Sequence, residues 1–100
     1  MQNVLEKINE NIQMVYRKAI DADAALDKLQ QSGKGKFTVI FSEETDFITR
    51  NKRFGPYVDE LALDFSKLET EQDGLENEIV IIVKKIQLLL ITIGKLKVAL

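Results

Sequence analysis

The sequence of 100 residues contains no cysteine and no histidine. The absence of cysteine excludes disulfides, thiolate metal sites and a cysteine nucleophile, and it is typical of proteins in a reducing, cytoplasmic compartment. The absence of histidine removes the commonest general base and the commonest metal ligand. We therefore predict that the chain is not an enzyme, and that it binds no metal and no cofactor.

Long uncharged apolar runs are also missing, as are internal repeats and low-complexity segments. The first residues lack the short apolar core of a secretory signal. A membrane-spanning helix needs about 20 apolar residues without charges. The most apolar stretch, residues 75–96, carries Lys84 and Lys85 at its centre, so we expect no membrane partner.

The hydrophobic fraction of 45% and the charged fraction of 30% predict one soluble, helix-rich domain over residues 1–100. The net charge of -2 is unevenly spread, because residues 54–78 hold one basic and eight acidic side chains while residues 79–100 hold four basic and no acidic ones. Helices of opposite charge would attract each other inside one bundle, and the alternative is that both sets of charges are solvated.

The stretch 75–96 organises the rest of the chain. Its apolar residues recur at steps of three and four, as on one stripe of an α-helix: Leu75, Ile79, Ile82, Ile86, Leu89, Ile93 and Leu96. The stripe is widened by Val80, Val83, Leu88, Leu90 and Ile91, and it is interrupted by Lys84, Lys85 and Gln87. Such a stripe needs at least two partner helices. A β-hairpin would suit the isoleucines and valines, but no turn residue occurs before Gly94, so we predict a helix over 75–97.

The same spacing predicts two further helices. The first, residues 2–31, has a seam of Leu5, Ile8, Ile12, Val15, Ala19, Ala22, Leu26 and Leu29. The second, residues 43–71, has a seam of Phe54, Val58, Leu61, Phe65 and Leu68 and an N-cap at Ser42. Gly55 and Pro56 should kink or break it, and its acidic residues, including Glu60 and Asp64, should face outward. The expected fold is an all-α, antiparallel three-helix bundle with a kinked or broken middle helix.

The segment between the first two helices offers two short features. Lys34 and Lys36 follow closely spaced glycines in a turn that lacks the full phosphate-binding loop pattern, so we expect a solvated loop there. The apolar run Phe37–Phe41 has no evident strand partner, and we predict that it plugs one end of the bundle.

Paired carboxylates are the remaining candidates for chemistry: Glu43 with Glu44, Asp59 with Glu60, and Glu69 with Glu71. Acid–base catalysis needs a cleft that separates two pKa values, and these pairs are predicted on exposed helical positions. Bundles that hold two metals use Glu-x-x-His pairs, which this sequence cannot form. We assign no catalytic or metal-binding residue.

A basic cluster is the strongest candidate binding site. Arg50, Lys52 and Arg53 lie close in sequence to Tyr57 and two phenylalanines. Cations interleaved with aromatic rings can neutralise a nucleic-acid backbone and stack bases, and the same cluster could bind an acidic protein segment. The alternative is that the phenylalanines belong to the core and the cations are solvated. We predict an exposed Tyr57 ring, with Lys34 and Lys36 as supporting cations.

The run from Phe47 to Leu61 (FITRNKRFGPYVDEL) resembles the primosomal replication protein PriC family, in its N-terminal part. The pattern is roughly F-x-x-R-x-x-x-[aliphatic or aromatic]-x-x-[aromatic]-x-x-E-[aliphatic], preceded by a phenylalanine, here Phe41. The resemblance covers residues 37–95 and is specific over the Phe47–Leu61 core. It implies a non-enzymatic replication-restart factor whose partners are single-stranded or forked DNA, the single-stranded-DNA-binding protein and the replicative helicase.

This chain departs from the family in two respects. Family members carry a further basic region that contacts the single-stranded-DNA-binding protein, and those residues have no counterpart before Leu100. Gly55–Pro56 is also not a family feature. The alternative function is a helical protein–protein interaction module, such as an adaptor, a chaperone or a secretion-apparatus subunit, without nucleic-acid binding. The sequence does not define the oligomeric state.

Overall fold

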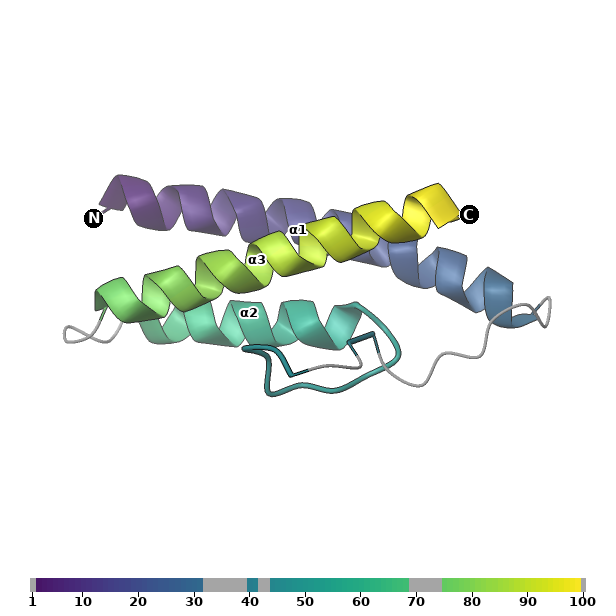
Figure 1. Ribbon diagram of the computed structural model, residues 1–100. Helices are drawn as coiled ribbons and strands as arrows, with labels where there is room; N and C mark the ends of the chain where they lie inside the picture. Colours follow the sequence, from purple (N-terminus) through teal and green to yellow (C-terminus); the bar gives the residue numbers. More distant parts are fainter. Residues whose placement is uncertain (1, 32–39, 42–43, 69–74, 100) are drawn as a thin grey trace.

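The computed structural model describes residues 2–31, 40–41, 44–68 and 75–99, with side chains for residues 3–31, 40–41, 44–68 and 75–96. In this part of the chain it contains three α-helices, α1 (Gln2–Gln31), α2 (Gly55–Leu68) and α3 (Leu75–Ala99), and no strand. Figure 1 shows α1 and α3 running in the same direction and α2 running against them. Each helix packs against the other two. The predicted all-α three-helix bundle is confirmed.

The core lies where the predicted seams meet. Its buried apolar residues are Ile8, Ile12, Val15, Ala19, Ala22, Leu26, Phe47, Phe54, Tyr57, Val58, Leu61, Leu68, Ile82, Ile86, Leu89 and Ile93. The longest extent of the molecule is 48 Å, close to the length of about 45 Å expected for the thirty-residue α1. Among the described residues, no helix has the length and apolar character needed to cross a membrane.

The stripe of α3 is narrower than its sequence predicted. It packs on both α1 and α2, as expected, but the widening residues Val80, Val83 and Ile91 are exposed. Leu88 and Leu90 are partly buried and pack against the core. The two partner helices therefore cover the seam and one flank of α3 and leave another flank open.

The middle helix is shorter than predicted, because residues 44–54 are not helical. We call this segment the 44–54 loop; its threonines, asparagine and β-branched Ile48 have modest helix propensity. Side chains replace the hydrogen bonds that a helix would supply: Thr45 Oγ1 accepts from the amide of Phe47 at 3.1 Å. Glu60, Tyr57 and Asn51 accept from further amides of the loop. Local bonds and bonds from α2 side chains thus satisfy several amides of the loop without helix formation.

The start of α2 is capped by a side chain from α1. Asp23 Oδ1 accepts from the amide of Phe54 at 2.7 Å, and Oδ2 accepts from the amide of Gly55 at 3.0 Å. These amides belong to the helix end that has no internal acceptors and that favours negative charge. A Cβ atom at position 55 would lie 3.3 Å from Asp23 Oδ2, so glycine suits this close approach. Gly55 and Pro56 therefore begin the helix and do not kink it.

The predicted plug is described only at Ile40 and Phe41, since residues 37–39 lie outside the described part. Both residues pack against the core. The Phe41 ring stacks on Phe47, with centroids 5.8 Å apart, and meets the Tyr57 ring edge-on at 5.2 Å. The amide of Ile40 donates to the carbonyl of Asn51 at 2.7 Å. This part of the run therefore anchors the 44–54 loop at the first turn of α2.

Candidate functional site

The structure separates the predicted basic cluster into free and paired cations. Arg50 and Lys52 are exposed on the 44–54 loop and form no ion pair with the described residues. Arg53 binds the Asp27 carboxylate of α1 and lies 3.9 Å from Asp23. The hydrogen bond and charge of Asp27 raise the pKa of Arg53. Arg53 therefore ties the loop to α1, and Arg50 and Lys52 are the cations available to a partner.

Tyr57 does not present an exposed ring, contrary to the prediction. Only 1% of its surface is accessible. Its ring packs edge-on against the Phe47 ring, with the ring centroids 5.1 Å apart. The Tyr57 hydroxyl accepts from the Asn51 amide at 2.9 Å and donates to the Asn51 carbonyl at 3.2 Å. Tyr57 thus holds the backbone of Asn51, the residue between Arg50 and Lys52.

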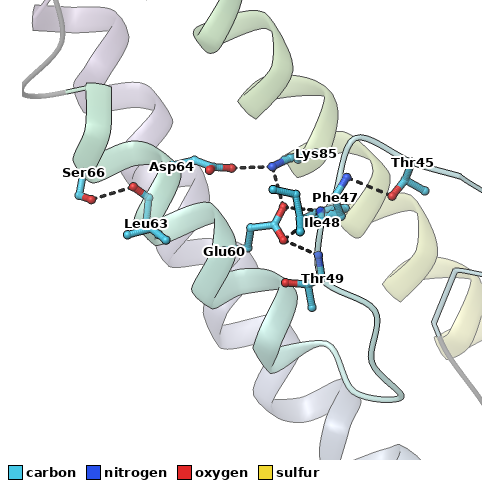
Figure 2. A network of polar contacts seen from close by, with 9 residues as sticks. All are labelled: Thr45, Phe47, Ile48, Thr49, Glu60, Leu63, Asp64, Ser66 and Lys85. Atoms are coloured by element: carbon cyan, nitrogen blue, oxygen red, sulfur yellow. Dashed lines mark hydrogen bonds and ion pairs between the residues drawn. The ribbon is translucent and has the colours of Figure 1, made fainter.

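Glu60 holds the other side of the same loop (Figure 2). Its carboxylate accepts from the amide of Ile48 at 3.0 Å and from the amide of Thr49 at 2.6 Å. It also accepts from Lys85 Nζ at 2.7 Å. Burial disfavours the charged carboxylate, but hydrogen bonds from Lys85, Thr49 and Ile48 together lower the pKa of Glu60 to about 2. The loop is therefore anchored by a carboxylate that is ionised at neutral pH.

Lys85 is buried between α2 and α3. Its ammonium group donates to Glu60 and, at 2.6 Å, to Asp64, and it lies 5.2 Å from the centroid of the Phe47 ring. Burial lowers the pKa of Lys85, but the hydrogen bonds and charges of Asp64 and Glu60 outweigh burial and raise it. The expected attraction between the acidic middle helix and the basic last helix is found in this contact.

The sequence predicted Glu60 and Asp64 on the outer side of their helix and Lys85 as an interruption of the apolar stripe, and all three expectations are wrong. Glu60 and Asp64 face inward, and Lys85 is part of the core boundary. The sequence does hold a signal for this: Lys85 lies at helical steps from Ile82 and Leu89, both of which are seam residues. The set Tyr57, Glu60, Asp64 and Leu68 is spaced in the same way, and so is the set Ala19, Asp23 and Leu26. A charged residue in seam register indicates a buried partner of opposite charge.

A solvent-open cavity lies beside the exposed cations. Its volume is about 400 Å³, and its walls include Phe41, Glu44, Phe47, Ile48 and Arg50. Ile48 is 89% exposed, so an apolar side chain projects at the cavity edge next to Arg50. The aromatic and aliphatic wall residues can pack against a flat group, and the Arg50 guanidinium can bind negative charge on that group, while the Glu44 carboxylate repels such charge.

Of the remaining candidates, Glu44 lines the cavity. Lys34, Lys36, Glu43, Glu69 and Glu71 lie outside the described residues. Within the described part of the chain, no group of acidic side chains is arranged to hold a metal ion. Asp59 is exposed, while its predicted partner Glu60 is committed to Lys85 and the loop.

Comparisons with protein-family models, with curated proteins and with solved structures find no match to this chain.

Proposed function

We propose that this chain is a non-enzymatic accessory domain of DNA-replication restart, similar to the PriC family, that contacts phosphates of single-stranded or forked DNA. Arg50 and Lys52 would make the contacts. One observation carries the proposal: the two cations are exposed on a loop whose backbone is held by Glu60 on one side and by Tyr57 on the other. Cations on a preorganised loop lose less conformational entropy on binding than cations on a flexible one.

The orientation of the α2 acids favours this proposal. The sequence predicted an acidic helix next to the basic cluster, and such a helix would repel a phosphate backbone. In the structure, Glu60 and Asp64 point inward and both bind Lys85. Asp59 is the one acidic residue of α2 with an exposed side chain. A phosphate backbone that approaches the 44–54 loop therefore meets less negative charge from α2 than the sequence indicated, and the exposed acidic residues of the loop itself are Glu44 and Asp46.

The cavity beside Arg50 supplies a second kind of contact. Phe47 is 8% exposed, and together with Phe41 and Ile48 it lines the cavity. Single-stranded nucleic acid exposes base faces that pack on such apolar surfaces while its phosphates bind nearby cations. The partners that the family resemblance implies, namely the single-stranded-DNA-binding protein and the replicative helicase, belong to the same proposal.

The test is fluorescence anisotropy of a labelled oligothymidine and a labelled forked duplex over a salt series. The double variant Arg50→Ser/Lys52→Ser should bind more weakly. The slope of log affinity against log salt should decrease by about 1.4, because two phosphate contacts to a single strand are lost. The control Lys7→Ser/Arg17→Ser removes the same charge from exposed positions of α1 and should change binding little. If the parent binds neither DNA, or if both double variants bind equally, the interaction-module alternative replaces the proposal.

Tyr57→Phe tests the role of the held loop. The substitution keeps the ring and removes the hydroxyl that bonds Asn51. The affinity for the oligothymidine should fall while the salt slope stays near the parental value, because Arg50 and Lys52 are present but no longer held. An unchanged affinity would mean that loop preorganisation contributes nothing to binding.

A further inference from the structure

A second exposed surface lies on α3 and is independent of the 44–54 loop cations. We call it the α3 outer face, and its residues are Val80, Val83, Lys84, Gln87, Ile91 and Lys95. Positions 80, 84, 87, 91 and 95 are separated by three or four residues, so they lie along one side of the helix. Val80 and Ile91 keep 51% and 56% of their surface accessible. Aliphatic side chains thus alternate with polar and basic ones on an open helix face.

The charged residues that α3 itself contributes to this face are lysines. Between Ile79 and Leu96, α3 contains lysines and no acidic residue. Lys85 is buried and already paired with Glu60 and Asp64. Lys84 and Lys95 are exposed and form no ion pair with the described residues. Both lysines also line a groove of about 540 Å³ between α3 and the 44–54 loop, and the acidic residues Glu44 and Asp46 line the loop side of that groove.

We propose that the α3 outer face docks an acidic amphipathic helix of a partner protein. The aliphatic side chains of that helix would pack on Val80, Val83 and Ile91, and its carboxylates would pair with Lys84 and Lys95. From Val80 to Lys95 the face is about 24 Å long, enough for four turns of a partner helix laid along it. The complementary charge is what identifies the partner as acidic.

Two other occupants fit this face less well. A second copy of the chain whose α3 lay parallel to this one would bring its own Lys84 and Lys95 against the same lysines, and like charges at a helix interface repel. Helices that lie on membranes carry large apolar or aromatic side chains and many lysines or arginines, whereas Val80, Val83 and Ile91 are aliphatic and flanked by two described lysines. An acidic helix satisfies the lysines and covers the aliphatic side chains together.

The experiment uses the full chain and two synthetic peptide probes. Each probe is a three-heptad helix with leucine and isoleucine at the seam; glutamate flanks the seam in one probe, and lysine replaces every glutamate in the other. Fluorescence anisotropy should show binding of the glutamate probe only. Lys84→Glu/Lys95→Glu should weaken that binding about tenfold or more and create binding of the lysine probe. Lys7→Glu/Arg17→Glu, the same charge change on exposed positions of α1, should alter neither result.

Amide chemical shifts of the labelled protein locate the bound glutamate probe, and the largest changes should fall on residues 80–95. Ile91→Ser should weaken binding without a loss of helical circular dichroism, because Ile91 is exposed. Equal binding of the two probes, or shift changes confined to other surfaces, would overturn the proposal. So would self-association that Ile91→Ser abolishes, or binding to phosphatidylglycerol vesicles without binding to either probe, since these outcomes assign the face to a second copy or to a lipid surface.

Discussion

The seams between the helices and the contact between the 44–54 loop and the bundle are both buried, but they use opposite chemistry. The seams join aliphatic residues such as Ile86 and Leu89, whose packing has no direction and depends on volume. The loop contact joins charged and polar groups such as Glu60 and Lys85, and each group depends on a matched partner. Loss of volume should therefore destabilise the seams, and removal of one partner should destabilise the loop contact by a similar or larger amount.

Two neighbouring lysines illustrate the difference. Lys84 is exposed, while Lys85 is 4% exposed and donates to Glu60 and Asp64. The rotation of about 100° between successive helical residues is enough to move an ammonium group from solvent into the core boundary. The same substitution at the two positions therefore tests which part of the bundle depends on charge.

Lys85→Met should have the largest effect. Two carboxylates, those of Glu60 and Asp64, would remain at a partly buried position without their cation, and breaking a buried ion pair costs about 3–5 kcal/mol. Urea unfolding followed by circular dichroism measures the loss. Lys84→Met, the exposed neighbour, should stay within about 0.5 kcal/mol of the parent. A loss below about 1 kcal/mol at position 85 would show that the ion pairs are not structural.

Ile86→Ala tests the seam in the same assay. Ile86 is buried between the helices, and truncation should cost about 2–5 kcal/mol because it opens a cavity that the surroundings fill only in part. Ile91→Ala removes the same atoms from an exposed position of α3 and is the control. Equal midpoints for the two variants would mean that Ile86 is not central to the core.

The loss of unfolding free energy at acid pH should depend on Glu60. Because the pKa of Glu60 falls from 4.5 to about 2 on folding, its contribution is present above pH 4.5 and is lost as the pH falls toward 2. The shift corresponds to about 3 kcal/mol. In Glu60→Gln, the unfolding free energy should therefore depend less steeply on pH between these two values. Asp59→Asn changes an exposed position and should keep the parental slope. A parental slope in Glu60→Gln would assign the acid sensitivity to other groups.

Asp23→Ala should have the smallest of these effects. It removes the acceptor for the amides of Phe54 and Gly55, and loss of a helix cap costs about 0.5–2 kcal/mol. Asp23→Asn keeps an acceptor oxygen and should recover part of the loss. Asp21→Ala changes an exposed carboxylate on the same helix and should be close to neutral. Equal stability of Asp23→Ala and Asp21→Ala would mean that the cap contributes nothing measurable.

The sequence by itself determined the three helices and most of the core. Steps of three and four identified α1 to the residue and the seam of α3, because burial of an apolar stripe is the dominant driving force and leaves a periodic pattern. That pattern is local: each helix shows it without reference to the others. For the same reason it could not distinguish the covered flank of α3 from the open one at Val80 and Ile91.

Tertiary structure alone decided the 44–54 loop and the candidate site. The sequence predicted helix there, an exposed Tyr57 and outward acids, because propensity and spacing describe one segment at a time. The partners lie far along the chain: Asp23 bonds the amide of Phe54, and Lys85 bonds Glu60. A buried charge is stable only where a distant segment supplies its counter-charge or donors. Asp27 binds Arg53 while Arg50 and Lys52 are exposed, and this pairing depends on the packing of α1 against the start of α2.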